Sequence, residues 1–363
     1  MSVHTVGRWL SATLILGSCQ QAPPAGRDDI ARIDLGEAAI VDGVSGPVPF
    51  ELPEGTRSFQ IEIVGSDERL HYVASLSGPG GPLVQEDYDP EVGETDRMVL
   101  GRFGPQRLSP NPVVPTAGVA AALFPNGPVA AERVSGGTYT LRVGATDGVG
   151  RPVSETVAVH LWVRETPVDS GEIDLHLYLT GAGGLSTESD STSLEEALDG
   201  VRAIFAARGV VLSDIELHDV ETRFAVIDRI EGPGDLRELF SRARGDGLHV
   251  FLVARFSDGG AGVSGGIPGP AFSSGAPASA VAVALDVAGS SPELLARSIA
   301  HECAHWLGLF HTSQSGRVAD PLSDTPIGEL ESENLLFPEL TGGAELTPQQ
   351  GEVLRSHPAI RRR

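Results

Sequence analysis

Three histidines and one glutamate near the C-terminal end of the sequence have the residue types and spacing of a metal site. His301 and His305 are four residues apart, and His311 follows after Gly308. On a helix, residues four apart lie on one face, so both imidazoles can reach one metal ion. Gly308 can adopt a backbone conformation that other residues resist, so the chain can turn sharply and bring His311 to the same ion.

The chemistry that suits this set is hydrolysis at a zinc ion. Three neutral imidazoles leave the fourth tetrahedral position of zinc for a water molecule. The ion lowers the pKa of that water and polarises a carbonyl group. Glu302, adjacent to His301, would take a proton from the water and deliver it to the leaving group. We therefore predict that His301, His305 and His311 bind zinc and that Glu302 is the catalytic base.

A helix over residues 292–307 must position this set. Ser291 is a good N-cap, and Pro292 suits the first helical position. Cys303 could be a redox group, a zinc ligand or a small buried apolar residue. We favour the buried role, because Ile299, Cys303 and Trp306 share the face opposite the histidines.

The surrounding residues, 171–363, predict an α/β domain with a twisted sheet. Strands and helices alternate, which favours this architecture. We expect strands over 172–179, 210–218, 248–253 and 280–285, helices over 193–208 and 236–243, and a Gly/Ser/Pro-rich loop over 257–277. Thr347 and Pro348 are typical of the start of a closing helix.

The preceding residues, 30–166, predict an all-β sandwich. Segments such as 58–64, 138–143 and 156–163 alternate apolar and polar side chains, with Gly/Pro-rich breaks between them. Residues 134–143 weakly resemble a hairpin of the pre-peptidase C-terminal type of sandwich. We interpret this region as an accessory domain, with a tether over 20–29 and a linker over 167–171.

The N-terminal residues, 1–19, resemble a bacterial lipoprotein signal. Arg8 is followed by a short apolar run that ends at Cys19. The resemblance implies lipidation of Cys19, export and anchoring at the outer membrane or cell surface; an ordinary signal peptide is the alternative. The formal net charge of −23 repels nucleic acid. No other stretch is long and apolar enough to span a membrane.

The segment from His301 to His311 resembles the metzincin signature, and the residues after it are similar to the pappalysin group. The shared segment runs from Asp320 through Asp324, Thr325 and the following proline. In that group this region can hold calcium, and these oxygen ligands suit the ion. A calcium site and a plain acidic turn both fit this segment.

Residues 334–338 resemble the metzincin Met-turn, in which a methionine packs beneath the metal. Leu336 holds that place here, and the only methionines are Met1 and Met98. Leucine has a similar volume, so we expect a mild change in the shape of the site.

The resemblance implies an endopeptidase that acts on proteins or peptides. The alternatives are an inactive surface adhesion or assembly lipoprotein with a zinc-binding peptidase fold, and a metal-dependent hydrolase of non-peptide amides. The intact set of His301, Glu302, His305 and His311 argues against an inactive protein.

Overall fold

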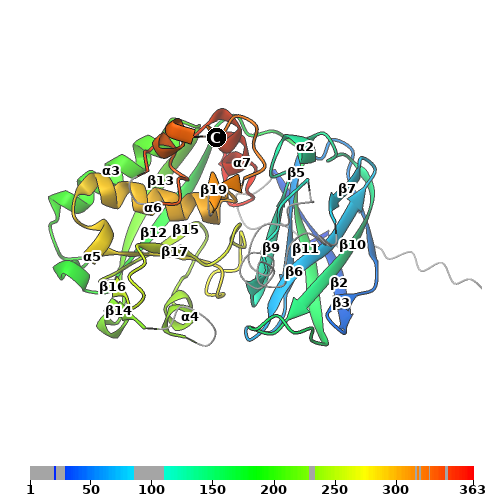
Figure 1. The fold of residues 1–363 in the computed structure, drawn as a ribbon, viewed down its shortest axis with the longest axis horizontal. Helices are drawn as coiled ribbons and strands as arrows, with labels where there is room; N and C mark the ends of the chain where they lie inside the picture. The colour runs from blue at the N-terminus through cyan, green and yellow to red at the C-terminus, as the bar shows by residue number, and fades with distance from the viewer. Residues whose placement is uncertain are drawn as a thin grey trace, which may run out of the picture.

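The computed structural model describes residues 20–21, 29–85, 110–228, 234–314, 317–318, 320–326, 328–339 and 342–363. Within them, the chain forms two large β-sheets, and most of its helices belong with the second sheet (Figure 1). None of the described helices is long and apolar enough to cross a membrane. Cys19 and the rest of the predicted signal lie outside the described residues.

The first sheet has eleven strands, and every pairing in it is antiparallel. Its strands are β1 (Gln20–Gln21), β2 (Ile30–Val41), β3 (Val44–Ser45), β4 (Val48–Leu52), β5 (Ser58–Val64), β6 (Leu70–Gly78), β7 (Gly81–Val84), β8 (Thr116–Ala117), β9 (Val119–Phe124), β10 (Gly137–Thr146) and β11 (Glu155–Arg164). A short helix, α2 (Pro128–Ala131), precedes β10. Gln20 and Gln21 pair with β2, although they belong to the predicted tether.

The expected all-β region is therefore present, but its strands form one curled sheet rather than two separate sheets. The long strand β2 joins the two parts, because it pairs with β11 on one side and β3 on the other. Val159 pairs with Gly36 but His160 pairs with Asp34, so β2 has a bulge at Leu35, and the positive φ of Gly36 lets β2 bend there. Apolar side chains of β5, β6, β10 and β11 form the core inside the curl.

The second sheet has the order β13-β12-β15-β18-β17, with β21 paired to the start of β12. Its first four strands are parallel, and β17 runs antiparallel at the edge. The bounds are β12 (Gly171–Leu179), β13 (Val210–Asp219), β15 (Leu248–Val253), β17 (Gly262–Ser264), β18 (Val281–Ala284) and β21 (Arg361–Arg362).

The helices are α3 (Thr192–Ala206), α4 (Asp235–Phe240), α5 (Leu285–Ala288), α6 (Pro292–Trp306) and α7 (Pro348–Ser356). Helices α3, α4 and α6 agree with the predicted helices to within three residues at each end, and α7 begins at Pro348 as predicted. The short helix α5 is not among the predicted helices, and it follows directly after β18, whose predicted strand extends to residue 285. Shorter elements are η2 (Ala182–Gly184), η3 (Thr222–Ala225), β14 (Val226–Ile227), β16 (Arg255–Phe256), β19 (Ser313–Gln314), β20 (Arg317–Val318) and η4 (Gly328–Glu333). Helices α3 and α6 pack on one face of the sheet, and α4 packs on the other.

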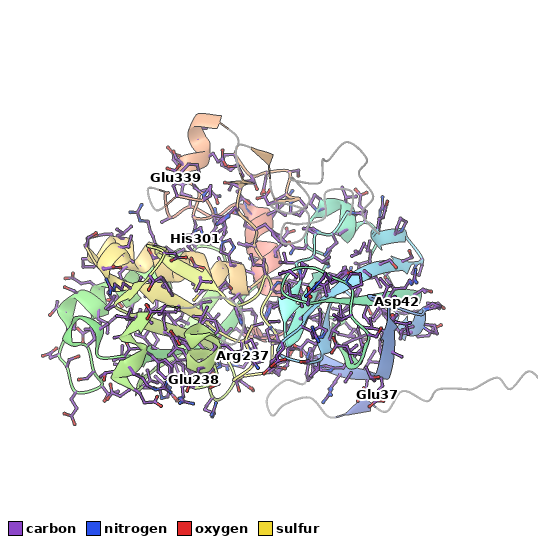
Figure 2. The ribbon with its side chains drawn as sticks, turned by 60° about the horizontal axis from the view of Figure 1, so that its bottom comes forward. Glu37, Asp42, Arg237, Glu238, His301 and Glu339 are labelled. Atoms are coloured by element: carbon purple, nitrogen blue, oxygen red, sulfur yellow. The ribbon has the colours of Figure 1, made fainter. Side chains whose placement is uncertain are left out.

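The two sheets share a continuous core. Ile30, Leu123 and Trp162 of the first sheet belong to the apolar cluster that surrounds α6. The buried side chain of Gln60 donates a hydrogen bond of 3.0 Å to the carbonyl of Gly269. Arg237 lies where the sheets meet (Figure 2) and forms an ion pair of 2.9 Å with Asp67. The Gln60 contact holds the first sheet against the loop that follows β17, and the Asp67 contact holds it against the helix over residues 235–240.

Candidate metal centre

Helix α6 begins and packs as its sequence predicts. The Ser291 hydroxyl caps it by accepting a hydrogen bond of 3.2 Å from the Leu294 amide. Gly200 of α3 lies against Ala296, where a Cβ on the glycine would be only 2.7 Å from the alanine Cβ. The missing side chain lets the two helices approach closely. Cys303 is buried on the core side, so it faces away from the histidines as the favoured interpretation expects.

The chain leaves α6 through Gly308, which has a φ of +109° that disfavours other residues. Its carbonyl accepts a hydrogen bond of 2.7 Å from the side chain of Asn126, a buried residue that follows β9. The first sheet therefore supports the turn that carries His311.

The three histidines meet at their Nε2 atoms. The separations are 3.0 Å between His301 and His305, 3.1 Å between His305 and His311, and 3.2 Å between His301 and His311. Together they form a group that could hold a metal ion. Zinc–nitrogen bonds of about 2.05 Å in a tetrahedron place the nitrogens roughly 3.3 Å apart, close to this spacing.

Hydrogen bonds to backbone carbonyls fix two of the three rings. The Nδ1 atom of His301 donates to the Leu335 carbonyl at 2.7 Å, and that of His305 donates to the Leu309 carbonyl at 2.6 Å. A carbonyl can only accept, so each Nδ1 carries the proton and each neutral ring presents an Nε2 lone pair. Such outer contacts are typical of histidines that bind metals.

Lone pairs facing one another at this distance repel unless a positive charge lies between them. Protonation of a ring is a poor source of that charge, because burial lowers the pKa of His311 to about 4 and that of His305 well below its usual value. Three neutral nitrogens at these separations therefore fit a metal ion, with spacings close to those of zinc ligands.

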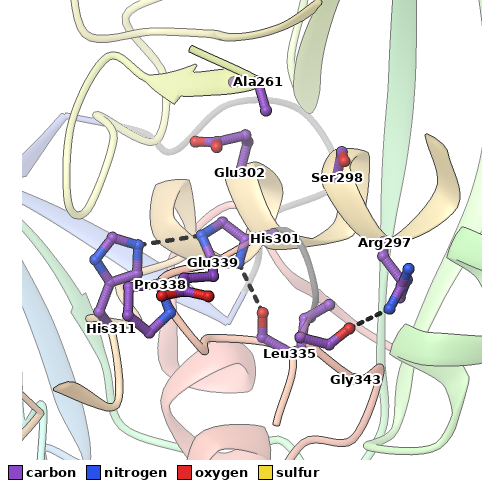
Figure 3. Close-up of a pocket in the computed structure, with 12 residues that line it drawn as sticks. Ala261, Arg297, Ser298, His301, Glu302, His311, Leu335, Pro338, Glu339 and Gly343 are labelled. Atoms are coloured by element: carbon purple, nitrogen blue, oxygen red, sulfur yellow. Dashed lines mark hydrogen bonds between the residues drawn. The ribbon is translucent and has the colours of Figure 1, made fainter. Parts of the chain in front are cut away.

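Glu302 lies beside this group without taking part in it. Its side chain lines the same pocket as His301 and His311 (Figure 3). Gly262 of β17 packs against it so closely that a Cβ there would be 2.5 Å from a carboxylate oxygen. Burial raises the pKa of Glu302 to about 8. A nearby cation would lower that pKa by favouring the charged form.

The pocket has a volume of about 200 Å³ and contains side chains that the motif does not reveal. Arg297, Ser298 and Glu339 line it beside the histidines (Figures 2 and 3). Helical spacing offers a signal for two of them, since Arg297 lies four residues before His301 and Ser298 lies four before Glu302. Glu339 comes from a distant loop, so no local pattern places it there.

Leu336 is fully buried in the core that surrounds α6. Its backbone carbonyl accepts a hydrogen bond of 3.0 Å from the amide of Thr312, the residue after His311. The neighbouring Leu335 supplies the carbonyl that orients His301. The turn over 334–337 therefore contacts both the helix that carries His301 and the segment that carries His311 through its backbone carbonyls.

The acidic segment after the third histidine is only partly described. Burial raises the pKa of Asp320 to about 7, and its carboxylate accepts a hydrogen bond of 2.9 Å from Thr325. One buried oxygen of Asp324 has no hydrogen-bond partner among the described residues. Asp320 and Asp324 do not belong to either described group of three potential metal ligands. Calcium binding here therefore stays a prediction.

Comparisons with known proteins find little similarity. No family model matches the chain, and no curated protein matches it. Among solved structures, metalloproteinase-II from Bacteroides fragilis matches half of this chain and half of its own length, with 11% identity and a TM-score of 0.30. The chain thus spans half the length of that metalloproteinase. A TM-score this low adds nothing to the geometry of the histidine group.

Proposed function

We propose that the chain is a zinc-dependent endopeptidase in which His301, His305 and His311 bind the ion and Glu302 is the catalytic base. The convergence of three histidine Nε2 atoms, two of them on rings held by backbone carbonyls, beside an open pocket carries this proposal. Three protein ligands leave a position for water, which separates catalytic from structural zinc sites.

The residues around the ion have distinct roles in this mechanism. Zinc bound there would polarise the substrate carbonyl and make the attacking water more acidic. Glu302 takes a proton from that water at a carboxylate oxygen and returns it to the leaving amine nitrogen. A cation bound by the three histidines would favour the charged form of Glu302, which is the form that accepts a proton. Leu335 and Leu309 hold two imidazoles in the tautomer that presents Nε2 to the metal.

The free edge of β17 suits an extended peptide substrate. Among the described residues, this strand is last in the sheet and its one strand partner is β18. Gly262 of this strand lines the pocket with Glu302, so a peptide added along β17 would pass the catalytic residues. Pairing through the backbone would favour peptide bonds over other amides.

Glu302→Gln is the direct test, because it keeps the shape of the side chain and removes the base. We expect normal zinc content and loss of peptide cleavage by roughly a hundredfold or more. A peptide library supplies the substrates and the cleavage preference. Cleavage at the wild-type rate by the purified variant would refute the role of Glu302.

An inactive adhesion or assembly protein is the competing function. Full zinc content in wild-type protein that cleaves no peptide of a broad library would favour it. The ordered pocket around Glu302 supports the enzyme instead.

We also propose that residues 30–166 are an accessory unit for a catalytic unit over 171–363, and that a lipid on Cys19 anchors the exported protein. Palmitate labelling that disappears in Cys19→Ala would support the anchor. Unchanged labelling would refute it.

A further inference from the structure

A second group of potential metal ligands lies on the face of the second sheet that is opposite α6. Side chains alternate along β12, so Leu175 and Leu177 contact the α6 core while His176 and Tyr178 point to the other face. On that face, His176 lies beside Glu216 and His218 of the neighbouring edge strand β13.

Three donor atoms of this group face one another. His176 Nδ1 is 3.2 Å from His218 Nε2 and 3.4 Å from a Glu216 carboxylate oxygen. The same oxygen is 3.7 Å from His218 Nε2. These separations lie near the roughly 3.3 Å between ligands of a tetrahedral zinc ion. Small movements of the two exposed side chains would complete the geometry.

The backbone already orients the central ligand. His176 Nε2 donates a hydrogen bond of 2.9 Å to the carbonyl of Asp246, so its neutral ring presents a lone pair at Nδ1. This is the arrangement that backbone carbonyls impose on metal-binding histidines. The His176 ring is also stacked between those of His218 and His249, at centroid distances of 5.4 and 5.0 Å.

The third histidine of this stack is engaged elsewhere. His249 Nδ1 lies 3.2 Å from the Tyr178 hydroxyl, and burial lowers the pKa of His249 to about 3. It is absent from the ligand group, which consists of His176, Glu216 and His218. The side chains of Glu216 and His218 are 61% and 36% exposed, so an ion and a water ligand could reach the site.

We propose that His176, Glu216 and His218 form a second metal site, which binds zinc or a similar divalent transition-metal ion. Two imidazoles and one carboxylate are a ligand set that suits these ions better than calcium or magnesium. The ion joins β13 to β12 and so stabilises the outer strand of the sheet. The site is independent of the proposed peptidase, because it lies across the sheet from His301 and at the edge opposite β17.

Zinc content of the full chain tests the proposal. Each protein is equilibrated with buffered Zn²⁺, desalted and analysed by mass spectrometry of the metal. We expect Glu216→Gln and His218→Gln each to hold about one equivalent of zinc less than wild type. Asp214→Asn, an exposed carboxylate two residues before Glu216, is the matched control and should keep the wild-type content. The expected difference in zinc content between wild type and the ligand variants is the same whether or not His301, His305 and His311 also hold zinc.

Thermal unfolding provides a second readout. Zn²⁺ should raise the melting temperature of wild type and Asp214→Asn by several degrees more than that of His218→Gln. Peptide cleavage should be the same in all these proteins. Equal zinc content in wild type and both ligand variants would overturn the proposal. A loss of zinc in Asp214→Asn as large as that in the ligand variants would also overturn it, because it would indicate binding by surface charge.

Discussion

The side chain of Asn126 donates a hydrogen bond of 2.7 Å to the carbonyl of Gly308, and so connects the first sheet to the turn between His305 and His311. Both groups are buried. The backbone N–H of Asn126 also donates a hydrogen bond of 2.6 Å to the side-chain oxygen of Asn111, which holds Asn126 in place. The first sheet therefore helps to hold the turn that positions His311, the third residue of the candidate metal centre.

Loss of this contact should loosen the third histidine. Asn126→Ala leaves the buried Gly308 carbonyl without its donor, which costs about 1–3 kcal/mol of stability. We expect lower zinc affinity as well, measured by competition with a chromophoric chelator. Ser58→Ala is the control, because Ser58 of the first sheet donates a hydrogen bond to the Ser356 carbonyl at the end of α7 rather than to the turn at Gly308. Equal zinc affinity in Asn126→Ala and wild type would show that the turn holds without the first sheet.

The close contact between Gly262 and Glu302 predicts a defect in catalysis without loss of metal. A methyl group at position 262 would overlap the Glu302 side chain and displace it. We expect Gly262→Ala to lower kcat by roughly ten- to a hundredfold with zinc content unchanged. In Gly260→Ala, the nearest atom to the new methyl is 3.3 Å away on the flexible Asp258, so activity should be kept. Similar kcat values in the two variants would argue against a role for the contact.

The buried side-chain amides of Asn334 and Gln350 hold the turn over 334–337, which contacts His301 and Thr312. They exchange two hydrogen bonds, of 2.9 and 3.1 Å, and Asn334 also accepts a bond of 2.9 Å from the Leu336 amide. Asn334→Ala should cost about 1–3 kcal/mol, because the Gln350 amide loses its partner. Denaturant unfolding of both single variants and the double variant measures the coupling. If the losses of unfolding free energy in the two single variants add up to the loss in the double variant, the two residues are not coupled and the prediction is wrong.

Leu336 predicts a graded response to side-chain volume. Leu336→Ala would leave a cavity in the core and should destabilise the protein by about 2–5 kcal/mol. Leu336→Met conserves volume and should cost less than about 1.5 kcal/mol, with activity and zinc retained. Thermal unfolding and kinetics check both variants. A methionine variant as unstable as the alanine variant would mean that shape at this position matters more than volume.

The ion pair of Asp174 with Arg361 predicts a dependence of stability on pH. Hydrogen bonds from Arg361 lower the pKa of Asp174 to about 2, so the pair stabilises the fold above pH 4 and loses this effect as the pH falls from about 4 to about 2. We expect about 1–2 kcal/mol, since both side chains are partly exposed. Measured by denaturant unfolding, Asp174→Asn should reduce the change in unfolding free energy between about pH 4 and about pH 2. Asp199→Asn, at an exposed ion pair, should leave that change as it is in wild type.

The sequence by itself determines the local part of the candidate metal centre. The helix and its cap at Ser291, the spacing of His301 and His305, and the turn at Gly308 all depend on residues close in the chain. Helix geometry and glycine backbone freedom act over these short distances, so a pattern of residue types is enough to predict them.

Only the tertiary structure decides which distant groups meet that helix. Gly262 against Glu302, Asn126 on Gly308, and the Leu335 carbonyl on His301 each join segments more than thirty residues apart. The curl of the first sheet and the pairing of His176 with Glu216 likewise depend on strand order and register. Register is set by packing of the whole sheet, and a shift of one residue would turn every side chain to the other face.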